Sequence, residues 1–288
     1  AESWLNDASD NRNRGQLFSF YMLINLASMA GGQFLLNVAE PSGFILFVLI
    51  SVLVSVAVIP ILTSVSKMPD YETTDSVGVL QLFRVSPLGV MGMLVSSIPI
   101  GTIFGLGSVY ASQIGLSVSE IAFFMGSIVI GGALVQFPLG KLSDIIGRRL
   151  VIIGTCFVGA TISFFATLYT DYGWQLGAIV GLVGAFTIPL YSLCATHTND
   201  YLNPAQMVAA SGTLVFVSSV GAAVGPLVTA VGMEYFRADF FFYSISFCLT
   251  LVGVFALWRV TKREGISFED RGEFVALAPT PISVSVNP

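Results

Sequence analysis

The segment Gly140–Arg149 (GKLSDIIGRR) holds the side chains of this sequence that are best suited to electrostatic work. It sets one carboxylate, Asp144, beside two guanidinium groups, Arg148 and Arg149, and it lies between two long apolar stretches. A carboxylate at a helix end can accept hydrogen bonds from the free N–H groups at the start of a neighbouring helix, and the helix dipole favours that placement. We therefore interpret the segment as a charged turn that holds helix ends together.

The composition shows why such a turn stands out. Charged residues make up 10% of the 288 residues, the hydrophobic set makes up 55%, and the mean hydropathy is +0.84. A soluble domain carries about 25% charged residues. A chain this apolar suits a lipid bilayer as its solvent. The net charge is −5 and the basic residues form no continuous stripe, so we do not expect a nucleic acid as a partner.

Residue types that perform catalysis or bind metals are scarce. The three cysteines, Cys156, Cys194 and Cys248, fall inside apolar stretches and lack a CxxC spacing, so we expect them to be packing residues. His197 is the only histidine. The GxSxG and HExxH patterns of hydrolases are absent from the sequence. We expect no metal site, no cofactor and no enzymatic activity.

Eight apolar stretches have lengths that suit helices crossing a bilayer core of about 30 Å. Lipid offers no partner for backbone N–H and C=O groups, so each should be a helix. A β-barrel would require alternation over about ten residues, which these stretches do not show. We therefore predict an all-α membrane protein with eight transmembrane helices, over residues 17–37, 43–65, 88–112, 119–140, 150–169, 174–196, 206–232 and 239–260.

The basic residues predict the orientation of these helices. Eleven of the twelve Lys and Arg residues lie in segments that would share one side of the membrane, and only Arg237 lies on the other. Because basic loops stay cytoplasmic, we expect both ends of this chain in the cytoplasm. Within the stretches no ionisable group lies near mid-depth, so no proton site is evident.

The chain also contains a weak internal repeat. A shift of 193 positions places Asn6 on Asn199, Asp7 on Asp200 and Gly32 on Gly225, and lays the first two stretches over the last two. The third to sixth stretches have no such counterpart. We interpret this as a six-helix repeat whose first copy lacks its first four helices.

Small residues and prolines recur within the predicted helices. Gly101 and Gly105 are four apart, as are Gly221 and Gly225, and Pro226 follows the second pair. Such glycines allow close helix approach, and prolines remove backbone hydrogen bonds and permit kinks. The pattern is compatible with helices that rock against each other and equally with ordinary tight packing.

The charged turn resembles motif A of the major facilitator superfamily, G-x-L-x-D-R-x-G-R-R/K, through Gly140, Asp144, Gly147, Arg148 and Arg149. The family's arginine after the aspartate is replaced by Ile145. The opening segment 2–6 (ESWLN) resembles a bacterial branch of that family, the YcaD-like permeases.

The resemblance implies a 6+6 helix bundle in which this chain supplies helices 5–12. Residues 1–65 would end the N-terminal bundle, 66–87 would be the cytoplasmic linker, 88–262 the C-terminal bundle and 263–288 a disordered cytoplasmic tail. Segment 221–226 (GAAVGP) resembles the family's antiporter motif C but lies in the other half, which weighs against a drug/proton antiporter.

The resemblance also implies roles for particular residues. Asp144 would latch the opposite half, at the start of the first helix near Gly15 and Gln16. Arg148 and Arg149 would face cytoplasmic carboxylates or lipid phosphate, unless they serve only to set the orientation in the membrane. In the family, helices 7 and 10 line the substrate cavity. That favours five neutral polar residues as substrate contacts: Asn25, Ser97, Thr102, Thr187 and Tyr191.

The sequence thus predicts a permease that transports a small solute across the bacterial inner membrane by alternating access. Its partners would be the lipid bilayer and an unknown small molecule, with the use of a coupling ion left open. The alternative is a non-transporting membrane subunit or sensor on the same fold, or the product of a truncated gene.

Overall fold

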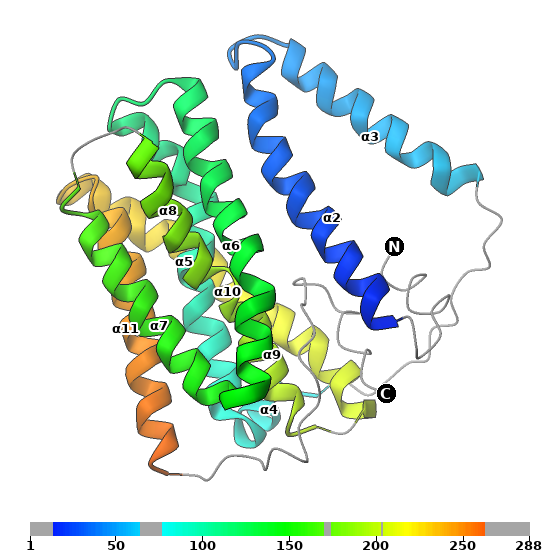
Figure 1. Ribbon diagram of the computed structural model, residues 1–288, viewed down its shortest axis with the longest axis vertical. Helices are drawn as coiled ribbons and strands as arrows, with labels where there is room; N and C mark the ends of the chain where they lie inside the picture. Colours follow the sequence, from blue (N-terminus) through cyan, green and yellow to red (C-terminus); the bar gives the residue numbers. More distant parts are fainter. Residues whose placement is uncertain (1–13, 64–76, 170–173, 203, 263–288) are drawn as a thin grey trace.

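The apolar stretches form helices because a helix satisfies its own backbone hydrogen bonds where lipid cannot. A computed structural model describes residues 14–63, 77–169, 174–202 and 204–262. Every regular element in that part of the chain is helical, which confirms the predicted fold class (Figure 1). The elements are α2 (Arg14–Phe34), the 3-10 helix η1 (Leu35–Asn37), α3 (Ile45–Thr63), α4 (Val79–Val85), α5 (Pro87–Gln113), α6 (Val118–Ile146), α7 (Arg148–Ala166), α8 (Trp174–Thr187), α9 (Leu190–Asn199), α10 (Pro204–Tyr235) and α11 (Phe240–Val260).

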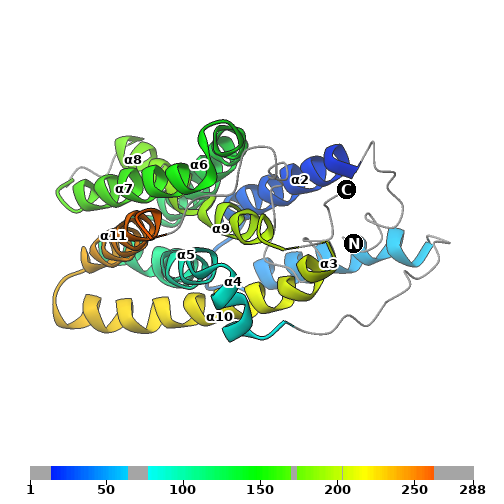
Figure 2. The same cartoon turned by 90° about the horizontal axis from the view of Figure 1, so that it is seen from below.

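Six of these segments are long and apolar enough to cross a membrane, and they form one bundle from α5 to α11 (Figure 2). The consecutive helices α8 and α9 count together as one span, Trp174–Asn199. The first two predicted stretches correspond to α2, which packs against α6, and to α3, which diverges from the bundle (Figure 1). Ile45–Pro60 of α3 is a shorter apolar helix.

Local structure differs from the prediction in three places. The charged turn is much shorter than expected, because α6 continues to Ile146 and α7 begins at Arg148, so Gly147 alone makes the turn. The sixth stretch is interrupted after Thr187, next to Pro189, whose missing N–H prevents a continuous hydrogen-bond ladder. The predicted linker 66–87 contains the short helix α4.

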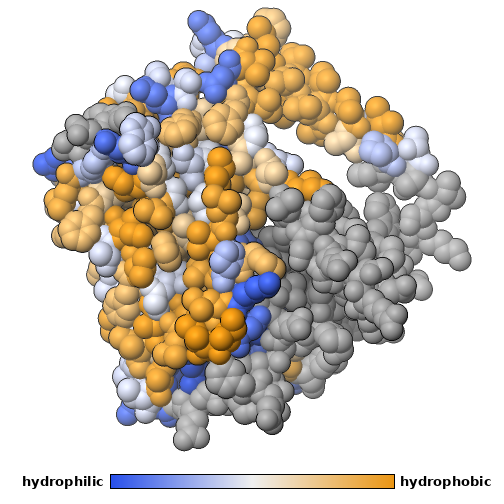
Figure 3. All heavy atoms as spheres, in the orientation of Figure 1, coloured by the Kyte–Doolittle hydropathy of each residue, from blue (hydrophilic) through white to orange (hydrophobic). Residues whose placement is uncertain are grey.

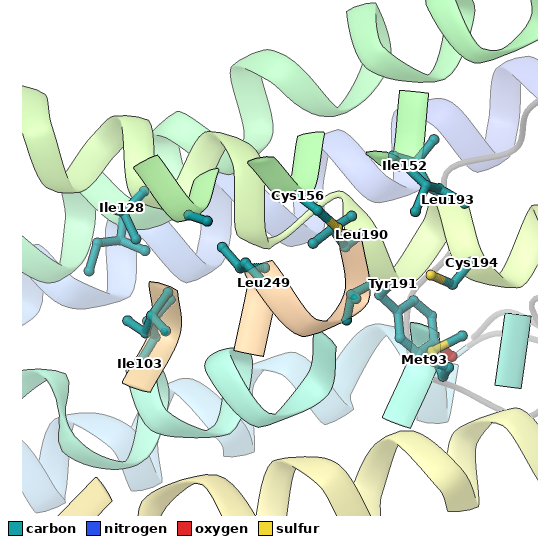
Figure 4. Close-up of a cluster of buried hydrophobic side chains, with 14 of the residues drawn as sticks. Met93, Ile103, Ile128, Ile152, Cys156, Leu190, Tyr191, Leu193, Cys194 and Leu249 are labelled. Carbon is teal, nitrogen blue, oxygen red and sulfur yellow. The ribbon is translucent and has the colours of Figure 1, made fainter. Parts of the chain in front are cut away.

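The core of the bundle is built from large apolar side chains on α5 to α11. At one end Tyr110 of α5 stacks on Phe241 of α11, with ring centroids 4.9 Å apart. Near the other end, Leu190 and Leu193 of α9 lie beside Cys156 and Ile152 of α7 (Figure 4). The outward-facing side chains are also largely apolar (Figure 3), as expected for a surface in contact with lipid.

Glycines allow α5 and α10 to pack backbone to backbone. A methyl group on Gly101 would lie 1.9 Å from the carbonyl oxygen of Ala222, and one on Gly221 would lie 2.1 Å from that of Leu94. Both distances are far below van der Waals contact, so only glycine fits at these positions. The same interface contains Gly105, Gly225 and Pro226.

Candidate functional site

Arg148 lies at the centre of a charged network at one end of the bundle. Its Nη1 donates to Asp144 Oδ1 over 3.1 Å, and its Nε donates to Asp200 Oδ2 over 2.6 Å. The Arg148 side chain is 2% exposed, Asp200 is 5% exposed and Asp144 is 34% exposed. A buried guanidinium must be paired, because an isolated charge in an apolar interior is strongly unfavourable. We call Asp144, Arg148 and Asp200 the charged network.

The turn between α6 and α7 brings these side chains together. Gly147 adopts φ 102° and ψ 134°, a conformation that other residues avoid, and this lets the chain reverse within one residue. Arg148 then starts α7 four residues after Asp144, which lies in the last turn of α6. A cation at a helix N-terminus is opposed by the helix dipole, so the two carboxylates offset an unfavourable placement.

Ser143 and Gly140 support the same turn from α6. The Ser143 hydroxyl donates to the Gly140 carbonyl oxygen over 2.6 Å, and Arg148 Nη1 lies 3.4 Å from the same hydroxyl. Gly140 and Ser143 are both buried. Ile145, at the position where the family pattern has arginine, is 72% exposed, whereas Arg148 is buried.

The neighbouring Arg149 makes a parallel contact. Its Nη2 donates to the hydroxyl of Tyr201 over 2.5 Å, and the Tyr201 ring packs edge-on against His197 at 5.3 Å between centroids. Arg148 and Arg149, the first two residues of α7, therefore contact Asp200 and Tyr201, the two residues that follow α9. The turn between α6 and α7 is joined to the end of α9 by two charge-assisted hydrogen bonds.

The sequence singled out Gly140, Asp144, Gly147, Arg148 and Arg149, and the structure places all five at this turn. It did not single out Asp200 and Tyr201 as their partners. The sequence did hold a clue to Asp200, because a carboxylate just after the sixth apolar stretch would lie on the same side of the membrane as Asp144. The predicted contact of Asp144 with Gly15 and Gln16 stays a prediction, since their side chains lie outside the described part of the chain.

The residues proposed to contact substrate fall into different environments. Ser97 of α5 and Thr187 of α8 are buried, and neither hydroxyl has a hydrogen-bond partner among the described residues. Tyr191 of α9 is 8% exposed and lies just past the Pro189 interruption. Asn25 of α2 is half-buried. Two of these residues therefore carry a buried hydroxyl that a ligand could satisfy.

Thr102, the fifth of these residues, takes part in a chain of hydroxyl groups between three helices. Its Oγ1 lies 3.1 Å from Thr229 Oγ1 of α10, and Thr229 donates in turn to Ser244 Oγ of α11 over 3.0 Å. Ser244 Oγ donates to the carbonyl oxygen of Phe241 over 2.8 Å. Thr102 thus faces the α5–α10–α11 interface, and its hydroxyl is already hydrogen-bonded.

Another polar contact crosses the bundle closer to the charged network. Gln136 Nε2 of α6 donates to Ser192 Oγ of α9 over 3.4 Å, and both side chains are buried. Within the described residues, no group of three or more His, Cys, Asp or Glu side chains could hold a metal ion.

Comparison with known proteins places this architecture in a family. Residues 88–284 match the family model of the Major Facilitator Superfamily. The chain is also 28% identical, over 247 residues, to proteins named uncharacterized MFS-type transporter YcaD from Escherichia fergusonii and from Escherichia coli K12. The alignment covers 85% of this chain and 64% of each relative, so the chain spans less than two-thirds of their length. Because the family match covers more than half of the chain and coincides with the helical bundle, this multi-pass membrane protein belongs to the Major Facilitator Superfamily.

Proposed function

We propose that this protein takes part in the transport of a small solute across a membrane by alternating access, with the charged network acting as a releasable latch at one end of the bundle. The observation that carries the proposal is the buried Arg148, which joins the turn between α6 and α7 to the residue after α9 through Asp200. Family membership and the apolar bundle support the same function.

An interaction that acts as a latch must stabilise one conformation without preventing the change to the other. Burying an ion pair removes water from both charges, and this desolvation nearly cancels their attraction. The pair of Arg148 and Asp200 is therefore well suited to stay closed when the helix ends meet and to hydrate when they separate. The more exposed Asp144 would keep Arg148 partly neutralised in both states.

The interruption between α8 and α9 gives the bundle a place to bend. Thr187 ends α8, and α9 begins at Leu190 after Pro189. Transporters place broken helices at their binding sites, because unpaired backbone and side-chain groups there can face the solute. Thr187 and Tyr191 flank the interruption, and Asp200 lies ten residues beyond the start of α9. A movement of α9 would thus couple solute contact to the charged network.

The proposed solute contacts follow from this hinge. Ser97 and Thr187 are the best candidates, because their buried hydroxyls have no partner within the described structure. Tyr191 and Asn25 come next. Thr102 is the weakest, because its hydroxyl is bonded to Thr229. Neutral hydroxyl and amide groups would suit a polar solute that does not depend on a buried counter-charge.

The charged network would face the cytoplasm. Asp144, Arg148 and Asp200 share one end of the bundle with Arg84 and Arg259, and basic residues mark the cytoplasmic side. We accordingly propose a bacterial inner-membrane location with both ends of this chain inside the cell.

The test uses the protein expressed from its own gene and reconstituted in liposomes. Uptake of a mixture of sugars, amino acids, carboxylates and nucleosides is followed by mass spectrometry, with protein-free liposomes as the baseline. At least one solute should enter faster with the wild type, and Arg148→Gln should slow its uptake. Arg237→Gln is the matched control, because Arg237 is 83% exposed and at the other end of the bundle.

A second readout follows accessibility without a known solute. In a background in which every cysteine is replaced by Ala, Ser97→Cys, at one of the proposed solute contacts, is treated with a membrane-impermeant maleimide from each side of the membrane. We expect the wild-type residues around the cysteine to allow labelling from both sides of the membrane. In the Arg148→Gln variant, the rate of labelling from the cytoplasmic side should rise relative to the rate from the other side. Labelling from one side only in every variant, together with uptake no faster than in protein-free liposomes, would contradict the proposal.

A further inference from the structure

A hollow of about 400 Å³ opens at the end of the bundle opposite the charged network. It lies between the beginnings of α6 and α8, and it is lined by three aromatic rings, Phe123, Phe124 and Trp174, together with the carboxylate of Glu120. Ligand sites in proteins have volumes of about 300–1,000 Å³ and combine apolar walls with a few placed polar groups. The hollow has this composition, and the transport proposal does not use it.

The aromatic walls are held by packing against the bundle. Phe124 is 1% exposed and contacts the Tyr110 ring at 5.9 Å between centroids. Phe123 lies across Gly177 of α8, where a methyl group would come within 2.2 Å of the ring. Trp174, the first residue of α8, is 74% exposed.

Glu120 is fixed in position but not neutralised. Its Oε2 accepts hydrogen bonds from the backbone N–H of Ser117 over 2.8 Å and from the Ser117 hydroxyl over 2.7 Å. Within the described residues, Oε1 accepts no hydrogen bond and no cation pairs with this carboxylate. The capping box also occupies the N–H groups of residues 117 and 120, so this helix start does not offer those donors to an anion.

The charges of the residues around the hollow also favour the binding of a cation. The described carboxylates at this end are Glu40, Glu120, Glu234 and Asp239, and the one described cation there, Arg237, lies 3.2 Å from Asp239. The local field is therefore negative, and negative clefts concentrate cations. Aromatic faces add attraction for an ammonium group that carries apolar substituents.

We propose that this hollow is a binding site for a small organic ammonium ion, with the charge at Glu120 Oε1 and the apolar part among Phe123, Phe124 and Trp174. The ammonium could belong to a free solute or to a phospholipid headgroup, since both present the same chemistry. The site lies outside the helix contacts used for the latch, so its test is independent of transport.

The test measures binding of choline by the full chain in nanodiscs through the fluorescence of Trp174. Trp258 and Trp4, the latter outside the described residues, are replaced by Phe so that Trp174 is the single reporter. The uncharged isostere 3,3-dimethyl-1-butanol separates charge recognition from apolar contact. Choline should change the emission with saturation below about 0.1 M, with a Kd at least about threefold lower than that of the isostere.

Glu120→Gln is the decisive variant, because glutamine preserves the capping box while removing the charge. It should raise the Kd for choline by about fivefold, whereas Glu234→Gln, at the same end but outside the hollow, should raise it by less than about twofold, because salt screens a more distant exposed charge. Equal Kd values for choline and its isostere, or an unchanged Kd in Glu120→Gln, would overturn the proposal, as would the absence of saturable binding in every lipid.

The lipid composition distinguishes the two sources of the ammonium group. Saturable choline binding in phosphatidylglycerol nanodiscs that disappears in phosphatidylcholine nanodiscs supports a site occupied by a lipid headgroup. Binding of equal strength in both supports a site for a free organic cation.

Discussion

Arg148 and Asp200 lie 52 residues apart in the sequence, yet their side chains meet at 2.6 Å, and both are almost fully buried. This contact joins the shortest turn of the bundle, Gly147, to the end of the interrupted span. Buried ion pairs add little net stability compared with apolar residues, but the loss of one partner leaves an unpaired charge. The contact is therefore better suited to break and re-form during a conformational change than to stabilise the fold permanently.

Asp200→Asn tests this contact by removing the charge while keeping the shape. We expect the free energy of unfolding to fall by about 2–3 kcal/mol, because Arg148 would stay buried while losing the more buried of its two carboxylate partners among the described residues. The measurement is the thermal unfolding midpoint in detergent. Arg237→Gln disrupts an exposed pair and should change stability by less than about 1 kcal/mol. Equal effects of the two variants would count against a buried network.

Gly147→Ala tests the one-residue turn. At φ 102° an alanine is strained, so we expect a loss of about 1–3 kcal/mol and an altered spacing between α6 and α7. Gly154→Ala is the matched control on α7, because a methyl group there meets no atom within 4 Å. That control should be neutral or slightly stabilising, since alanine favours helices over glycine. Similar unfolding midpoints for both variants would show that the turn can relax.

Gly101→Ala tests the close approach of α5 and α10. The added methyl group would lie 1.9 Å from a backbone oxygen of Ala222, so the helices must move apart, at an expected cost of about 1–3 kcal/mol. Gly212→Ala on α10 meets no neighbouring atom and serves as the control. Thermal unfolding compares the two, and a distance measurement between spin labels on α5 and α10 should show the separation only for Gly101→Ala.

The all-helical fold could be predicted because the bilayer imposes it locally. Each apolar stretch must satisfy its own backbone hydrogen bonds, so the helices follow from composition and length without knowledge of their neighbours. The importance of Asp144, Arg148 and Arg149 was also visible, because charge is rare in this chain and its position between two helices is unambiguous.

Only the tertiary structure decided which groups these charges meet. Asp200 becomes the partner of Arg148 because α7 and α9 pack with their ends together, and Thr102 turns toward Thr229 because glycines let α5 and α10 approach closely. Such contacts depend on helix rotation and interaxial distance. Those quantities are set by side chains from several segments at once, so they cannot be read from any single stretch of the sequence.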